Sequence, residues 1–292
     1  MSNKKRLPSN TAKGSKRRIE TSCVAWFDLL GYGKMLRAAA FDPTHESTEL
    51  AIQRLDSFQA LIEKHTCKSF LTLALNDGGA AHRDLSPRDS SVTYDFIKRS
   101  FNLYNEINEV EFANGFPGVR MVVAAGFRIR RNRQTKNELL NGYAQRLIAQ
   151  VDDNEISTKE SIYKAITVKP FSAAVPELQA NFAFSKAYIA ESSGTKGGLP
   201  GPAMYLDSSL VKSLSPTGLS ISEAIDWEYP GLDSTFLKID EVLPVEASKN
   251  RYADIRNAFE VAEALSISKD VVSRLKSQPV RPFEQQTSGT ET

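Results

Sequence analysis

The sequence predicts a mixed α/β fold (α+β), with strands and helices in the order β-α-β-β-α-β and helical additions towards the C-terminus. Three observations lead to this prediction. The run from Cys23 to Phe27 is short, apolar and rich in aromatic and β-branched residues, which is typical of a buried strand. The segment Asn76-Asp77-Gly78-Gly79 lies between two extended runs, which is a strong hairpin signal. Segments 44–65 and 91–110 repeat apolar residues at helical spacing.

The remaining elements of this unit follow in chain order. The first strand and the helix at 44–65 are followed by strands at 69–75 and 80–83, the helix at 91–110 and a strand at 119–129. This order is that of a ferredoxin-like core, in which the first two strands run parallel and the third lies antiparallel between them. The later predicted elements are helical pieces at 136–150 and 158–166, a helix at 177–191, a strand at 203–206, a short helix at 208–214, a strand at 236–245 and a closing helix at 250–276.

The domain organisation predicted from composition is simple. One domain covers residues 21–276 and contains an insertion at about 130–176. Residues 1–20 and 277–292 are polar tails that we expect to be disordered. The first tail is basic, but it has no interleaved aromatic residues on which bases could stack, so no nucleic-acid partner is expected.

Composition excludes several classes of protein. The 292 residues carry 37 Lys and Arg against 35 Asp and Glu, a net charge of +2, which implies no polyanionic partner for the chain as a whole. The two cysteines, Cys23 and Cys67, provide no disulfide framework and fit a reducing compartment. The longest apolar run, about Met121 to Phe127, is far shorter than the ~20 residues that span a bilayer. We therefore expect a cytoplasmic protein with no membrane partner.

Two acids stand where the predicted topology brings chain segments together. Asp28 ends the first strand and is followed by bends at Gly31 and Gly33, and Asp77 lies in the hairpin turn. In a ferredoxin-like core these acids share one edge of the sheet, two strand spacings or roughly 10 Å apart. Glycine lets backbone amides approach an anion, and paired carboxylates hold Mg²⁺ or Mn²⁺. The pattern therefore suits two-metal phosphoryl or nucleotidyl transfer.

Other catalytic patterns are not found in the sequence. His45, His65 and His82 have no triad-like partners, and no His or Cys cluster offers a zinc ligand set. The chain has no G-x-S-x-G nucleophile motif, no Walker loop and no dinucleotide-binding fingerprint.

Four segments resemble the motifs of one family, the class III adenylate and guanylate cyclases. Phe27-Asp28-Leu29-Leu30-Gly31-Tyr32 resembles the signature that opens the catalytic domain, and Asn76-Asp77-Gly78 resembles the hairpin with the second metal aspartate. Residues 120–127 are similar to the family's Arg-x-Gly-Ile strand, and residues 201–208 to its late Gly-x-x-x-Val-Ser segment. The resemblance covers about 23–245, in order.

The resemblance implies a catalytic mechanism. Asp28 and Asp77 would be the catalytic acids and would bind two ions per site, Mn²⁺ or Mg²⁺, with the backbone carbonyl of Leu29 as a further ligand. The ribose 3′-OH would attack the α-phosphate and release pyrophosphate. Family members form homodimers with sites at the interface, so a two-fold dimer is expected here.

The resemblance also implies a nucleotide-binding stretch around the first acid, formed by Phe27, Leu30, Gly31 and Tyr32. The backbone amides of the last three would hold the triphosphate. Tyr32 and Arg83 are candidates for contact with the base only because they lie near the two motifs.

The sequence departs from the family at three positions. Ser185 and Ile189 stand where the family has a ribose-binding Asn and a transition-state Arg. Lys186, with Arg120, is the candidate substitute for that missing cation. Leu73 stands where purine cyclases carry a residue that reads the base.

Loss of the purine-reading residues with both metal acids kept resembles the pyrimidine cyclases of the bacterial Pycsar antiphage system. That resemblance implies a stand-alone uridylate cyclase that converts UTP to cUMP, which then activates a separate effector protein.

Four alternatives stay open on the sequence. The chain could be a cytidylate cyclase that makes cCMP, or a non-catalytic, cyclase-like domain that binds nucleotide as a sensor. A nucleic-acid-binding protein led by the basic tail is a third reading. In the fourth, both acids are turn residues of an unrelated α+β fold.

Overall fold

The computed structural model of the 292-residue chain describes residues 18–130, 138–167, 175, 177–243, 252–265 and 268–278. The described residues form two compact units. The smaller unit contains Ile129–Ala180 together with Arg18, and the larger contains Ile19–Arg128 and the residues from Asn181 onward. Of the predicted tails, residues 1–17 and 279–292 lie outside the described residues, whereas residues 18–20 belong to the first strand.

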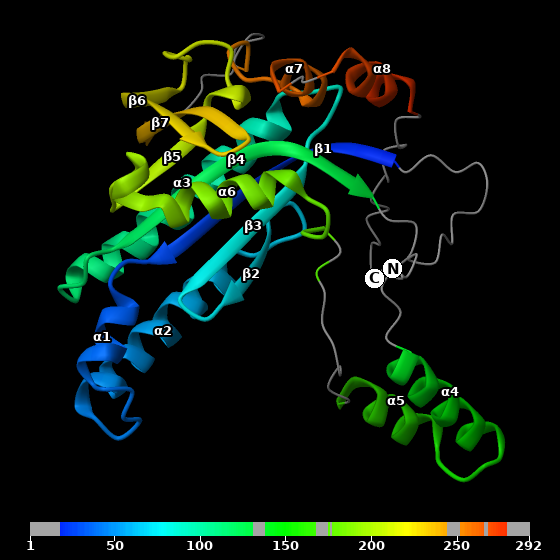
Figure 1. Ribbon diagram of the computed structural model, residues 1–292. Coiled ribbons are helices and arrows are strands. Elements are labelled where there is room, and N and C mark those ends of the chain that lie inside the picture. The colour runs from blue at the N-terminus through cyan, green and yellow to red at the C-terminus, as the bar shows by residue number, and fades with distance from the viewer. Residues whose placement is uncertain are drawn as a thin grey trace, which may run out of the picture. The chain divides into compact units, whose positions relative to one another are not determined.

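The larger unit is built on a seven-stranded sheet with the order β2-β3-β1-β4-β5-β7-β6 (Figure 1). Its strands are β1 (Arg18–Leu29), β2 (Leu71–Leu75), β3 (Gly78–Asp84), β4 (Val119–Arg130), β5 (Ala203–Asp207), β6 (Leu219–Tyr229) and β7 (Leu232–Val242). Strand β3 pairs antiparallel with both β1 and β2, so β1 and β2 run parallel. The predicted β-α-β-β-α-β core, and with it the mixed α/β class, is confirmed.

The second half of the sheet was predicted less completely. Strand β5 lies parallel to β4, and β6 and β7 form a long antiparallel hairpin. Strand β7 begins at Leu232, four residues before the predicted start at 236, and β6 was not predicted. The physical reason is exposure: most side chains of β6 are partly or fully exposed, so its sequence, Leu-Ser-Ile-Ser-Glu-Ala-Ile-Asp-Trp-Glu-Tyr, lacks the apolar run expected of a buried strand.

The helices of the larger unit are α1 (Tyr32–Ala38), α2 (Glu46–His65), α3 (Ser91–Ala113), α6 (Phe182–Ser193), α7 (Ala258–Ala264) and α8 (Lys269–Ser277), with 3₁₀ turns η1 (Gly194–Gly197) and η2 (Ser208–Leu210). Helix α6 starts later than predicted because Asn181 is its N-cap and its side chain accepts a hydrogen bond from the Phe184 amide. The predicted helix at 208–214 is only the three-residue turn η2, and the closing helix is two pieces, α7 and α8.

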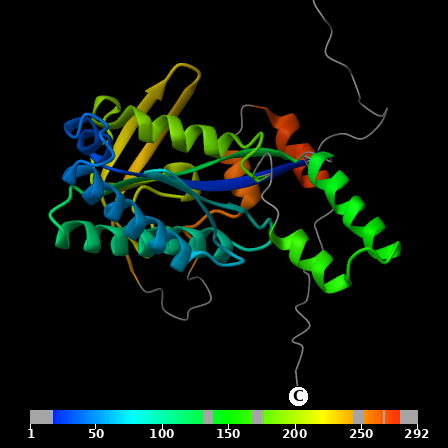
Figure 2. The ribbon, with the colours of Figure 1, turned by 90° about the horizontal axis from the view of Figure 1, so that it is seen from below.

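The side chains of β1 alternate between the two faces of the sheet. Cys23, Ala25, Phe27 and Leu29 are buried in the main core, which also contains residues of α2 and α3. Because side chains alternate along a strand, Trp26 and Asp28 belong to the opposite face. There the ring of Trp26 meets residues of α6. Figure 2 shows α6 on one side of the sheet and α2 and α3 on the other.

The smaller unit contains α4 (Glu138–Asp152) and α5 (Thr158–Thr167), which pack against each other. These helices match the pieces predicted at 136–150 and 158–166 within two residues at each end. No described residue of α5 is buried. Among the described helices, none combines the length and the apolar character required to cross a membrane.

Candidate active site

Asp28 and Asp77 are brought together by the ladder between β1 and β3. Asp28 is paired with Gly78, and the amide of Leu29 donates a hydrogen bond of 2.9 Å to the carbonyl of Asp77. The two backbones are therefore one strand apart, whereas the sequence predicted two strand spacings. The prediction was wrong on this point because Asp77 lies at the tip of the hairpin, where the chain has already turned towards β3.

Glycine at position 78 keeps space open beside the first carboxylate. A Cβ atom built on Gly78 would lie 3.3 Å from Oδ1 of Asp28 and 3.0 Å from the Trp26 ring. A Cβ on Gly79 would overlap the ring of Phe27 on the core side. The two glycines therefore serve the packing around Asp28 as well as the hairpin turn. A side chain at either position would crowd the neighbouring strand β1.

The Asp28 carboxyl lies in an unfavourable electrostatic environment for a negative charge. Burial, followed by the charges of Glu191 and Asp77, raises its pKa from 3.8 to about 7. The guanidinium groups of Arg120 and Arg54 act in the opposite direction without cancelling the effect. The site therefore has an excess of negative charge that a bound cation would neutralise.

Glu191, on α6, is a site residue that the sequence analysis missed. It accepts hydrogen bonds of 3.0 and 2.6 Å from Nε and Nη2 of Arg120, and the two side chains are only 5% and 12% exposed. Burial raises the pKa of Glu191, and Arg120, followed by the indole of Trp26, acts in the opposite direction. Arg120, which was predicted to contact the nucleotide, is therefore held next to Asp28 by a buried carboxylate from another element.

The turn after Asp28 is fixed through its backbone. The amide of Leu30 donates to the carbonyl of Gly118 at 2.9 Å, and the carbonyl of Leu30 accepts from Nη2 of Arg54 at 3.0 Å. The Leu30 amide was predicted to hold the triphosphate, and this part of the prediction is wrong because the bond to Gly118 already occupies it. The amides of Gly31, with φ of 78°, and Tyr32 follow in the same turn.

The rings of two predicted residues pack in the core. The side chain of Phe27 is fully buried and meets Phe58 of α2 edge-on, with 6.0 Å between ring centroids. The side chain of Tyr32 is 4% exposed and belongs to the same core. Burial, followed by the charge of Asp77, raises the pKa of Tyr32. The ring of Tyr32 is therefore part of the core, and contact of its hydroxyl with a base stays a prediction.

The structure places Lys186 away from the acid pair. Its Nζ lies 2.6 Å from Oδ2 of Asp207, and both side chains are buried. Asp207 also accepts hydrogen bonds from the amides of Ala125 and Ser209. Among the described residues, the Lys186 ammonium contacts Asp207 and the ring of Phe236, so the structure does not bring it to Asp28 or Asp77.

The other predicted residues are dispersed. Ser185 is exposed, and its hydroxyl lies 3.5 Å from the Asn181 carbonyl. Leu73 is half-buried on β2, opposite Ala80 of β3. Arg83 forms an ion pair with Asp95 and lies opposite Cys23, five residues along β1 from Asp28.

The donor set fits hard divalent cations. Among the described residues, no group of three or more His, Cys, Asp or Glu side chains could hold a metal ion. The carboxylates of Asp28 and Asp77 are hard oxygen ligands, which suit Mg²⁺ and Mn²⁺ and not zinc. The protein would therefore supply two carboxylates, and the remaining ligands would be backbone, substrate or water oxygens.

Comparisons with known proteins add a fold-level similarity. No family model matches the chain, and no curated protein matches it. The chain is similar to solved structures of the guanylyl cyclase Cya2 (TM-score 0.46, 10% identity, 79% of this chain and 97% of that chain) and of the adenylyl cyclase CyaB from P. aeruginosa (TM-score 0.41, 8% identity, 78% and 97%). A third is a bacterial light-regulated adenylyl cyclase (TM-score 0.41, 10% identity, 82% and 57%). Similarities of this size assign no activity to the chain.

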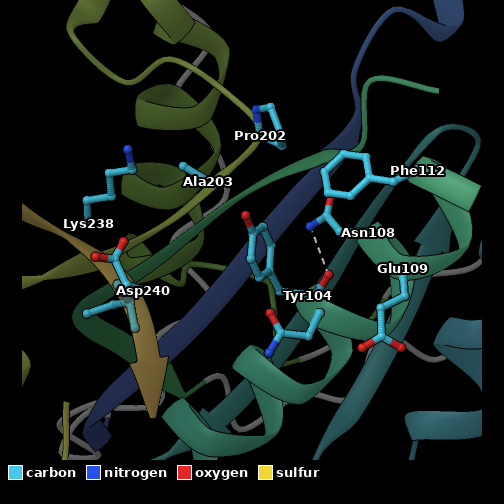
Figure 3. Close-up of a pocket in the computed structure, with 10 residues that line it drawn as sticks. Tyr104, Asn108, Glu109, Phe112, Pro202, Ala203, Lys238 and Asp240 are labelled. Atoms are coloured by element: carbon cyan, nitrogen blue, oxygen red, sulfur yellow. Dashed lines mark hydrogen bonds between the residues drawn. The ribbon is translucent and has the colours of Figure 1, made fainter. Parts of the chain in front are cut away.

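A hollow of about 380 Å³ lies beside α3 and is distinct from the acid pair (Figure 3). Tyr104 and Phe112 of α3 line it together with Pro202 and Lys238. Burial raises the pKa of Tyr104 to about 12. The hollow adjoins the site through Gly118, because a Cβ there would meet Phe112 at 2.9 Å and Pro202 at 3.1 Å.

Proposed function

We propose that this protein is a nucleotide cyclase that converts a nucleoside triphosphate to a 3′,5′-cyclic monophosphate and pyrophosphate. The observation that supports this most directly is the position of Asp28 and Asp77 on neighbouring chain segments, which the bond from the Leu29 amide to the Asp77 carbonyl joins. Gly78, opposite Asp28, leaves space open beside the carboxylate. An anionic pair with a raised carboxyl pKa and hard oxygen donors is what a divalent-metal nucleotidyl-transfer site requires.

Asp28 and Asp77 would hold two Mn²⁺ or Mg²⁺ ions, with the Leu29 carbonyl as a further ligand. When bound, the ions would favour ionisation of the ribose 3′-OH and neutralise the leaving pyrophosphate. The amides of Gly31 and Tyr32 would bind the triphosphate at the bend where the chain leaves β1.

Arg120 is the cation that we assign to the developing charge on the α-phosphate. Its guanidinium is oriented by two hydrogen bonds to Glu191 and acts electrostatically on Asp28. Oriented donors of this kind need little reorganisation as charge develops. Lys186, the other candidate, has its ammonium committed to Asp207.

We further propose that the substrate is a pyrimidine nucleotide, with UTP favoured over CTP. Leu73, at the position where the resembling purine cyclases read the base, has no hydrogen-bonding side chain. By the same resemblance, the enzyme acts as a homodimer with sites at the interface, and cUMP activates a separate effector in antiphage defence.

A nucleotide sensor without turnover is the second candidate. Two observations favour it: α6 carries Ser185 and Ile189 where the resembling enzymes carry Asn and Arg, and the Leu30 amide is already bonded within the protein. A sensor would be stabilised by nucleotide but would release no cyclic product.

The deciding experiment incubates the purified chain with ATP, GTP, CTP and UTP in turn, with Mn²⁺, and identifies products by mass spectrometry. The proposal expects cyclic monophosphate from UTP, none from Asp28→Asn or Asp77→Asn, and normal amounts from Asp240→Asn, an exposed acid on β7. Cyclic product from a purine triphosphate would contradict the assigned base. Binding of nucleotide with no cyclic product would favour the sensor.

A further inference from the structure

Arg54 is a buried cation at a core position of α2. The buried side of this helix is formed by Thr48, Ala51, Arg54, Phe58 and Ile62, at helical spacing. The Arg54 side chain is only 1% exposed. A charge at such a position needs a partner, and Arg54 has an unusual combination of partners.

The first partner is Glu111 of α3. Nε of Arg54 lies 3.0 Å from both carboxylate oxygens of Glu111, and Nη2 bonds to Oε2. The guanidinium also lies over the ring of Phe116, 4.6 Å from its centroid. The ion pair by itself balances the charge of Arg54 and joins the two helices.

The second partner is the turn after Asp28. Nη2 of Arg54 donates to the carbonyl of Leu30 at 3.0 Å, and the amide of Leu30 donates to the carbonyl of Gly118 at 2.9 Å. Leu30 is therefore held at both of its backbone polar groups, by α2 on one side and by the residue that precedes β4 on the other.

This double contact sets the direction of the neighbouring backbone groups. In a trans peptide the C=O and N–H bonds point in opposite directions. Because the Leu30 carbonyl points to Arg54, the Gly31 amide of the same peptide points away from it. Because the Leu30 amide points to Gly118, the Leu29 carbonyl points away from Gly118. These are the groups assigned above to the triphosphate and the metal.

We propose that Arg54 is a positioning residue that, together with Gly118, fixes Leu30 so that the Leu29 carbonyl and the Gly31 amide face the site beside Asp28. Arg54 reaches the turn from the core side and touches no substrate. The identity of the two ligands rests on the proposed function, whereas the fixing of the turn rests on the contacts alone.

The chain contains a matched control for a purely structural role. Arg128 of β4 is also buried and pairs with Asp84 of β3. Asp84 lies opposite Ser22, six residues along β1 from Asp28, or about 20 Å at the rise of a strand. Replacing either arginine by lysine keeps the charge and loses the planar fork that makes several bonds at once.

The test compares Arg54→Lys and Arg128→Lys with the parent chain. Binding of inorganic tripolyphosphate in the presence of Mn²⁺ is measured by calorimetry, so no turnover is needed, and the free energy of unfolding is measured in parallel. We expect Arg54→Lys to weaken binding at least tenfold in folded protein and Arg128→Lys to change binding less than twofold. Equal weakening in both variants, or binding by Arg54→Lys within twofold of the parent, overturns the proposal.

A measurement on the unaltered chain covers the case in which Arg54→Lys does not fold. Hydrogen exchange at the Gly31 amide, followed by NMR, should be fast in the free protein and slowed at least tenfold by Mn²⁺ and tripolyphosphate. An unchanged rate on saturation, or no binding at all, overturns the proposal. Binding that depends on Arg54 in a chain that makes no cyclic product would remove the cyclase assignment and keep this inference.

Discussion

The amide of Leu29 donates to the carbonyl of Asp77, and this bond of 2.9 Å joins the end of β1 to the tip of the neighbouring hairpin. It places the carboxylate-bearing residues Asp28 and Asp77 one strand apart at the same edge of the sheet. The candidate site therefore depends on a backbone contact, and the placement of its two aspartates is part of the fold.

Asp28→Asn should stabilise the metal-free protein at high pH. The pKa of Asp28 is about 7 in the folded chain against 3.8 for an ordinary carboxyl, so the folded state keeps this proton as the unfolded state loses it. The stability of the parent chain thus falls as pH rises from about 4 to 7. Asparagine does not titrate, so the variant avoids this loss of stability. At about 1.4 kcal/mol per pKa unit, the variant should be more stable than the parent by roughly 2–4 kcal/mol at pH 8.

Urea unfolding of both proteins at pH 4 and pH 8, with chelator, checks this prediction. The difference between the proteins should be small at pH 4, and Mn²⁺ at pH 8 should stabilise only the parent. A variant that is less stable than the parent at pH 8 without metal would contradict the raised pKa.

Glu191→Gln should extend Mn²⁺ binding to lower pH. The charge of Glu191 is the largest contribution after burial to the raised pKa of Asp28, so its removal lowers that pKa. Mn²⁺ competes with the proton for this carboxylate, so the pH midpoint of binding should fall by about half a unit to one unit.

The same variant should turn over about tenfold more slowly under the proposed function, because Arg120 loses the carboxylate that orients it. Calorimetric titrations with Mn²⁺ between pH 5 and 8 measure the midpoint, with the exposed Glu109→Gln as the control. An upward shift, or an equal shift in the control, would show that Glu191 does not act on Asp28.

Lys186→Met should affect stability and leave the chemistry intact. The substitution leaves Asp207 buried without its partner. Removal of one member of a buried ion pair lowers the free energy of unfolding by about 3–5 kcal/mol. Turnover per folded molecule should stay within about twofold of the parent. Denaturant unfolding and product formation at low temperature measure the two effects. A well-folded Lys186→Met chain that makes no product would instead give Lys186 a catalytic role.

Gly78→Ala should weaken metal binding with little loss of stability. The added methyl would lie 3.3 Å from Oδ1 of Asp28 and 3.0 Å from the Trp26 ring, in the space next to the carboxylate. We expect Mn²⁺ affinity to fall about tenfold and the free energy of unfolding to fall by about 1 kcal/mol. Calorimetry with Mn²⁺ compares this variant with Gly142→Ala, whose added methyl meets nothing within 4 Å. Equal Mn²⁺ affinity in the two variants would show that the space beside Asp28 has no role.

One buried pair could have been anticipated from the sequence. Arg54 and Glu111 occupy buried positions of α2 and α3 at the same spacing as apolar neighbours. Opposite charges in the apolar stripes of two adjacent helices indicate an ion pair between them. Glu191 gives a weaker signal, because it shares the buried face of α6 with Lys186 and three alanines and has no row of large apolar neighbours.

The sequence by itself determined the order of the elements, the hairpin and the positions of both aspartates. These features depend on periodicity and turn chemistry, which act over a few residues. Only the tertiary structure decided which charges meet. Arg120 pairs with Glu191 71 residues away, Arg54 with Glu111 57 away, and Lys186 with Asp207 21 away. Such pairs form because burial makes an unpartnered charge costly, and burial is a property of the whole fold.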